Sequence, residues 1–192
     1  MSASIAPAAG ALPGTPGSPV PQRLTDRSLR VHRVAQDDPL ATPLLAELAV
    51  EYSSRYGRSA GQMHHELRNY PPTRFAAPHG GLLVVTQDSE AVAGGAFQRY
   101  DDDSAELKRI WTSKEHRRQG LGRFVVRQLE LEVSRRGYRR IYLTTGWRQP
   151  EAVALYLAVG YTALFDPALP AEQIGAHAFE KVLPAADLEA TA

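Results

Sequence analysis

The sequence predicts an α/β fold in which a single domain holds one mixed β-sheet of about six or seven strands, flanked by about four helices. Two observations lead to this prediction. Segments with strand-like and helix-like patterns follow one another in the order β-α-α-β-β-β-α-β-α-β-β. In addition, Leu121, Val125, Leu129 and Val133 recur every four residues, which is typical of a helix that buries one face. Such an alternation favours helices layered on one sheet.

The predicted domain covers residues 27–184. Residues 1–26 are rich in Ala, Pro, Gly and Ser and show no periodicity. A segment of this composition cannot bury enough apolar surface to offset the entropy lost on ordering, so we expect a disordered leader. Residues 185–192 are expected to form a flexible tail.

Local signals set the limits of the expected elements. Pro71-Pro72 must end a helix, Asp88-Ser89-Glu90 is typical of a hairpin turn, and Gly137 is a helix stop. In chain order we expect a strand from residue 29, helices over 44–52 and 60–69, strands over 81–86, 91–99 and 105–112, a helix over 120–137, a strand over 140–145, a helix over 149–159, and strands over 160–165 and 177–183.

The composition argues against several classes of protein. The formal net charge is +1, and the arginine-rich stretch 135–140 ends a helix without interleaved aromatic residues, so we expect no nucleic-acid partner. The absence of cysteine excludes disulfides and thiolate sites and suits a cytoplasmic location. No apolar run approaches the roughly 20 residues that cross a bilayer. His64 and His65 would point about 100° apart on a helix, so we expect no metal site.

The glycine-rich segment Arg117-Arg118-Gln119-Gly120-Leu121-Gly122 lies between a predicted strand and a predicted helix. Glycines there let a ligand approach the backbone closely, and the N–H groups at a helix start attract anions. This arrangement predicts a pyrophosphate site. An ordinary tight turn is the alternative interpretation.

Four segments together resemble a bacterial branch of the GCN5-related N-acetyltransferase superfamily. Arg117, Gly120 and Gly122 match its pyrophosphate loop, Arg/Gln-x-x-Gly-x-Gly/Ala. Residues 149–161 resemble its second signature, although Gln149 replaces the usual Asn. The segments 106–112 and 179–181 resemble its central and closing strands.

The resemblance implies that acetyl-CoA is a cosubstrate and that the central strand splays from its neighbour to hold it. The pantetheine arm would pair with backbone groups of the central strand, and the pyrophosphate would bind at the glycine loop. The implied donor-binding residues are Ile110, Trp111, Thr112, Arg117, Arg118, Gln119, Gly120, Leu121, Gly122 and Arg123.

Transfer to an amine requires a base and an acid. An alkylamine with a pKa near ~10 is mostly protonated at pH 7 and must lose a proton before it attacks. On a regular strand, Glu106, Lys108, Ile110 and Thr112 would share one face. By resemblance, Glu106 is the candidate base and Tyr156 the candidate acid. The alternatives are that Glu106 only pairs with Lys108 and that Tyr156 only packs in the core.

The first helices offer a candidate acceptor pocket. Two arginines and few acidic residues there favour a substrate with a carboxylate over a polycation, because arginine can bind a carboxylate with two hydrogen bonds. The alternative is that these arginines are merely solvated. The candidate acceptor-binding residues are Tyr52, Arg55, Tyr56, Arg74 and His79.

Together these features predict an acetyl-CoA-dependent N-acetyltransferase whose partner is a small-molecule or peptide amine. A non-catalytic acyl-CoA sensor on the same fold is the alternative. A homodimer is one arrangement that the sequence allows.

Overall fold

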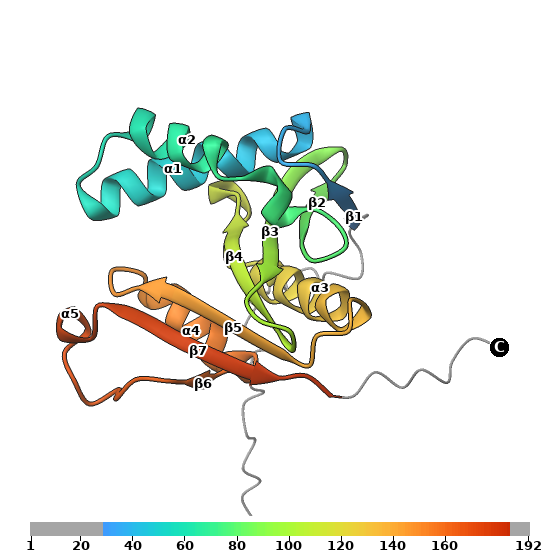
Figure 1. Cartoon of the computed structure of the whole chain (residues 1–192). Helices are drawn as coiled ribbons and strands as arrows, with labels where there is room; N and C mark the ends of the chain where they lie inside the picture. The colour runs from blue at the N-terminus through green and yellow to red at the C-terminus, as the bar shows by residue number, and fades with distance from the viewer. Residues whose placement is uncertain (1–28, 185–192) are drawn as a thin grey trace, which may run out of the picture.

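The computed structural model describes residues 29–184, so the predicted leader and tail lie outside the described residues. Figure 1 shows a sheet that parts into two halves. The strands are β1 (Leu29–Val34), β2 (Gly81–Gln87), β3 (Glu90–Arg99), β4 (Ser104–Thr112), β5 (Arg140–Gly146), β6 (Thr162–Ala163) and β7 (Ala176–Val182). The helices are α1 (Thr42–Tyr56), α2 (Ala60–Asn69), α3 (Leu121–Arg135), α4 (Pro150–Ala158) and α5 (Ala171–Ile174), with 3-10 turns η2 (Pro39–Ala41), η3 (Pro72–Phe75) and η4 (Lys114–His116).

The seven strands form one mixed sheet in the order β1-β2-β3-β4-β5-β7-β6. Strands β4 and β5 run parallel and pair only from Ser104 opposite Arg140 to Glu106 opposite Tyr142. Beyond that pair they diverge, with α1 and α2 on one side of the gap and β5 on the other (Figure 1). The predicted α/β sheet with a splayed strand pair is confirmed. The strand expected over 160–165 is shorter, since only Thr162–Ala163 is extended.

Two apolar cores lie on opposite faces of the sheet. Neighbouring residues of a strand point to opposite faces. Accordingly, Leu83 and Val85 of β2 belong to the core beneath α3 and α4, whereas Leu82 and Val84 belong to the core beneath α1. The four-residue spacing on α3 places its apolar side chains in the first core, as predicted.

A β-bulge interrupts β4. One residue of β3, Gly95, stands opposite both Arg109 and Ile110 of β4, and Arg109 adopts a left-handed φ of 60°. A bulge adds an unpaired residue and shifts the alternation of side chains that follows it. A Cβ at position 95 would lie 2.7 Å from the Ile110 side chain, so glycine leaves the room that Ile110 occupies.

The bulge overturns the expectation that four side chains of β4 share one face. Glu106 and Lys108 lie on the α2 side, where Glu106 bonds with Gln98. Ile110 instead packs into the core beneath α3, and the Thr112 hydroxyl also faces α3. The prediction was wrong because it assumed an uninterrupted strand.

Candidate active site

A cavity of about 370 Å³ lies where β4 and β5 have parted; we call it the donor cavity, after the predicted donor-binding residues that line it. It opens between the end of β4, the glycine loop and α4. All of the predicted donor-binding residues except Gln119 line it, and Tyr156 joins them. Its lining is Glu51, Ile110, Trp111, Thr112, Arg117, Arg118, Gly120, Leu121, Gly122, Arg123, Gln149, Glu151, Ala152, Leu155 and Tyr156.

The glycine loop has the backbone shape of an anion site. Arg118 and Gly120 adopt left-handed φ values of 60° and 86°. Gly120 is the N-cap of α3 and no side chain caps the helix start. The first backbone N–H groups of α3 are therefore left to a ligand. A Cβ at Gly122 would come within 3.3 Å of Leu155, so glycine keeps the cavity open at this point.

Gln149, which replaces the family's usual Asn, is engaged locally. Its side-chain oxygen accepts hydrogen bonds from the Thr145 hydroxyl at 2.9 Å and from the Gly146 N–H at 3.1 Å. These bonds fix the turn between β5 and α4.

The Glu106 carboxylate lies at the last β4–β5 pair, outside the lining of the donor cavity. It accepts hydrogen bonds from Gln98 Nε2 at 2.8 Å and from Lys108 Nζ at 2.7 Å. Gln98 in turn accepts a bond of 2.8 Å from the Tyr70 hydroxyl. With a side chain only 13% exposed, Glu106 is held in a fixed position beside the gap.

Tyr156 reaches the donor cavity from α4. Its ring packs against Tyr161 and Phe179, with centroid distances of 5.7 and 5.6 Å. Burial raises the pKa of the Tyr156 hydroxyl well above its ordinary value, and nearby Tyr52 adds to the effect. The phenol is therefore neutral at pH 7 and can donate its proton.

The predicted acceptor residues of α1 lie close to the turn between β5 and α4. Tyr52 is half-buried, and burial raises its pKa to about 12. A Cβ at Gly146 would overlap the Tyr56 hydroxyl, so that glycine lets α1 approach. Arg55 pairs with Glu51 at 3.1 Å and with Glu151.

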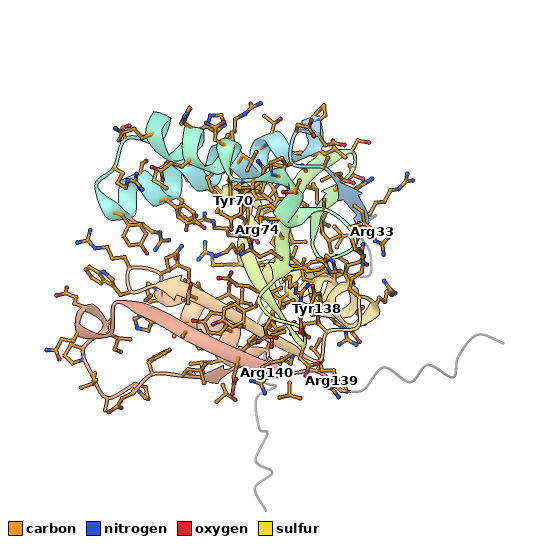
Figure 2. All side chains as sticks on the ribbon, viewed as in Figure 1. Arg33, Tyr70, Arg74, Tyr138, Arg139 and Arg140 are labelled. Atoms are coloured by element: carbon orange, nitrogen blue, oxygen red, sulfur yellow. The ribbon has the colours of Figure 1, made fainter. Side chains whose placement is uncertain are left out.

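Arg74 and His79 do not line the donor cavity. Arg74 is an exposed residue of η3, near Tyr70 in Figure 2. The His79 carbonyl accepts a hydrogen bond of 3.0 Å from Tyr138, which follows the C-terminus of α3. Since α3 has 15 residues, His79 lies roughly 20 Å from the glycine loop at the other end of the helix.

Sequence reasoning missed Arg109, because a bulge leaves no local signal. Arg109 is 7% exposed, and its guanidinium donates to Gln36 at 2.8 Å and to the Leu67 carbonyl at 2.6 Å. It also lies 4.6 Å from the ring centroid of Phe75. Within residues 29–184 no carboxylate comes within ion-pair distance, and burial lowers the pKa of Arg109 to about 10. An unpaired positive charge thus lies beneath α2.

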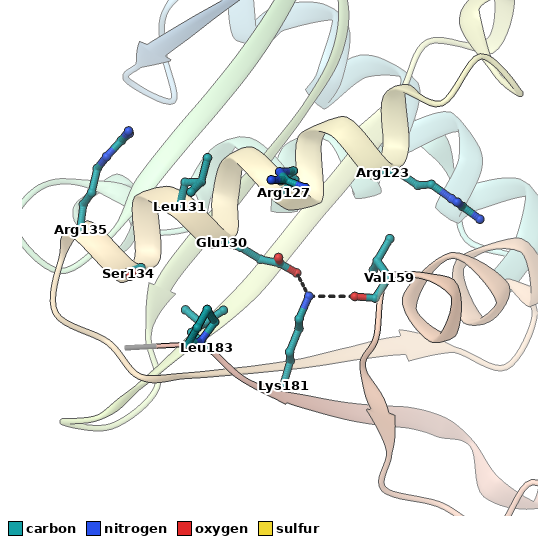
Figure 3. Close-up of a pocket in the computed structure, with 10 residues that line it drawn as sticks. Arg123, Arg127, Glu130, Leu131, Ser134, Arg135, Val159, Lys181 and Leu183 are labelled. Atoms are coloured by element: carbon teal, nitrogen blue, oxygen red, sulfur yellow. Dashed lines mark hydrogen bonds and ion pairs between the residues drawn. The ribbon is translucent and has the colours of Figure 1, made fainter. Parts of the chain in front are cut away.

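A second cavity, of about 650 Å³, flanks the outer face of α3 (Figure 3). It shares Arg123 with the donor cavity. Arginines and Lys181 line an apolar floor, and Lys181 donates to Glu130 and to the Val159 carbonyl, each at 2.8 Å. Its lining is Arg123, Arg127, Glu130, Leu131, Ser134, Arg135, Val159, Lys181, Leu183 and Pro184.

Within residues 29–184, no cluster of three or more His, Cys, Asp or Glu side chains could hold a metal ion. Among these residues, no helix has the length and apolar character needed to span a membrane.

Known proteins resemble this fold over most of its length. A Klebsiella pneumoniae protein provisionally assigned as an acyl-CoA N-acyltransferase is 27% identical, with a TM-score of 0.61 over 82% of this chain and 99% of that one. The PaiA N-acetyltransferase of Thermoplasma acidophilum, solved with coenzyme A, has a TM-score of 0.63 over 81% of this chain and 99% of that one. At 14% identity, the second likeness shows the fold alone.

Sequence comparison is more specific. Human N-acetyltransferase 8 is 32% identical over 94 residues, which cover 45% of this chain and 41% of that protein. The chain thus matches about two fifths of that relative's length. The model of the acetyltransferase (GNAT) family matches residues 43–161, which include the splayed strand, the glycine loop and α4. The chain belongs to the acetyltransferase (GNAT) family.

Proposed function

We propose that this protein transfers an acetyl group from acetyl-CoA to a primary amine of a small molecule or peptide. The observation that carries the proposal is the cavity between β4 and β5, which joins the glycine loop to Tyr156. An anion site and a neutral phenol at one cavity suit a donor that carries a pyrophosphate and leaves as a thiolate.

The residues of the cavity fit coenzyme A. Beyond Glu106, the edge of β4 is not paired with β5, so backbone groups of Ile110 and Thr112 can pair with the amides of pantetheine. The Thr112 carbonyl accepts a bond of 3.4 Å from Arg117 Nε, which the donor would replace. The N–H groups that follow Gly120 are available to the pyrophosphate. The basic rim of the second cavity, reached past Arg123, suits the 3′-phosphate.

Direct transfer then needs a base and an acid. Glu106 accepts a proton from the ammonium group of the acceptor, and the neutral nitrogen attacks the carbonyl carbon of the thioester. A C–N bond forms and the C–S bond breaks. Tyr156 donates a proton to the departing sulfur, and the second proton of the attacking nitrogen returns to the Tyr156 phenolate, so a neutral amide and a thiol are formed. Hydrogen bonds from Gln98 and Lys108 hold the Glu106 carboxylate in position to accept the proton.

For the acceptor we propose an amino acid, an amino-acid-like molecule or a peptide end. The buried Arg109 has no carboxylate partner among the described residues and leaves positive charge on the α2 side of the gap. Positive charge disfavours polycations and favours a substrate that carries a carboxylate. Arg55 is less available than the sequence suggested, because Glu51 and Glu151 already pair with it.

A screen of acetyl-CoA consumption against panels of amines tests both parts of this proposal. We expect turnover with amino acids or peptides and little with spermidine or kanamycin. Efficient acetylation of the polycations, with amino acids and peptides inert, would show that the acceptor class is wrong. Tight binding of acetyl-CoA without turnover on any amine would favour the non-catalytic sensor.

Replacing Tyr156 by Phe should lower kcat by roughly 10- to 100-fold, because the thiolate then leaves without its proton donor. The affinity for CoA should hardly change, since only a hydroxyl is lost. Steady-state kinetics and calorimetry measure the two effects. Tyr161→Phe is a matched control: its hydroxyl is buried and its ring packs against Tyr156, but it does not line the cavity. Equal rates for both variants would leave Tyr156 as a packing residue.

A further inference from the structure

Glu51 of α1 lies between the donor cavity and the predicted acceptor residues. Its carboxylate forms an ion pair with one arginine on each side. Its Oε2 lies 2.7 Å from the Arg117 guanidinium of the glycine loop. Its Oε1 lies 3.1 Å from the guanidinium of Arg55, one turn further along α1. The Glu51 side chain is 19% exposed and lines the donor cavity.

A carboxylate at this place opposes the binding of an anion. A pyrophosphate and the Glu51 carboxylate would repel one another across the cavity, and both would compete for Arg117. Arg117 is 44% exposed, so its guanidinium has room to turn from Glu51 towards a ligand. Donor binding must therefore either break the Glu51–Arg117 pair or lose the help of Arg117.

The ion pair of Glu51 with Arg55 adds to a set of contacts between α1 and the start of α4, which we call the clasp: those of Arg55 with Glu151 and Arg148. Arg55 pairs with Glu151 and donates to the Arg148 carbonyl, while Arg148 donates to the Arg55 carbonyl at 2.6 Å. Arg148 also stacks on Trp147, 4.4 Å from the ring centroid. These contacts join the end of α1 to the turn after β5, where the two halves of the sheet face each other.

We propose that Glu51 is a positioning residue that couples donor binding to this clasp. The donor's pyrophosphate takes Arg117 from Glu51, and the freed carboxylate then pairs with Arg55 alone and tightens the clasp on the acceptor side. The proposal rests on the donor site proposed above. It predicts that Glu51 affects donor affinity mainly through Arg117, and only slightly through direct repulsion of the pyrophosphate, which salt screens.

A double-mutant cycle measured by calorimetry with CoA tests that dependence. Glu51→Gln should tighten CoA binding about 5-fold, because it frees Arg117 and removes a repulsive charge. Arg117→Gln should weaken binding by a similar factor. In the Arg117→Gln background, Glu51→Gln should change the affinity by less than about 2-fold. Additive effects of the two changes would overturn the proposal.

Glu151→Gln is the matched control, because Glu151 lines the same cavity and pairs with Arg55 but not with Arg117. Its effect on CoA affinity should be the same with Arg117 present or replaced. If Glu51→Gln behaved in the same way, Glu51 would be one of two equivalent charges, and the coupling would be refuted.

Trp147 reports on the clasp independently of affinity. CoA should change the tryptophan fluorescence of the wild-type protein, and the part of the change that Trp147→Phe abolishes belongs to the clasp. The Glu51→Gln protein should bind CoA without the fluorescence change that depends on Trp147. A full Trp147 response in this variant would overturn the coupling. Failure of the wild-type protein to bind CoA would instead remove the donor site itself, and the coupling with it.

Discussion

Gly120→Glu is expected to weaken acetyl-CoA binding by about 100-fold, or ~2.7 kcal/mol, while the protein remains folded. Gly120 lies at the start of α3 with a φ of 86°, next to the backbone N–H groups that we propose bind the pyrophosphate. The new carboxylate would occupy this anion site and repel the phosphates. A side chain at such a φ costs only about 1 kcal/mol, less than a domain's stability. Calorimetry and thermal melting separate the two effects.

Two controls isolate the charge from the backbone. Gly120→Asn adds a neutral side chain that tolerates the left-handed region, so it should keep most of the affinity. Gly137→Glu repeats the same change at the other end of α3, at a φ of 89° with open space around it, and should bind normally. Unchanged affinity in a folded Gly120→Glu protein would remove the pyrophosphate assignment.

Glu106→Gln is expected to lower kcat by about 100-fold or more, in keeping with the loss of a positioned general base. The amide keeps the size of the side chain and can still accept the bond from Lys108, so the fold and the affinity for CoA should persist. The low-pH limb of the rate profile should disappear, because the group that must lose its proton is gone. Steady-state kinetics over a range of pH measure both effects.

Glu180→Gln serves as the control for charge alone. Glu180 stands opposite Tyr142 on β7, the strand beyond β5, and its carboxylate pairs with Arg140 at 3.8 Å. Its rate should match that of the wild-type protein. Near wild-type turnover in Glu106→Gln would rule out this base, and a lowered melting temperature with normal turnover would mean that Glu106 pairs with Lys108 only for stability.

Much of the fold followed from local signals in the sequence. The spacing of Leu121 to Val133 predicted α3, since a helix turns once every 3.6 residues whatever surrounds it. The loop at Gly120 was equally local, because only the backbone of a short segment shapes it. The residues predicted to bind the donor, except Gln119, therefore line a single cavity, and their role there stays a prediction.

Tertiary structure alone decided which side chains meet across the gap. The bulge at Arg109 arises from the register between β3 and β4, and no residue pattern within β4 predicts it. It turned Ile110 away from Glu106 and buried Arg109 beneath α2. Glu51 lies one turn from Arg55 on α1, but the other partner of Arg55, Glu151, lies on α4, whose approach to α1 depends on packing of the whole domain. Sequence periodicity sets the face of an element, whereas pairing between elements depends on register and close packing that only the assembled sheet defines.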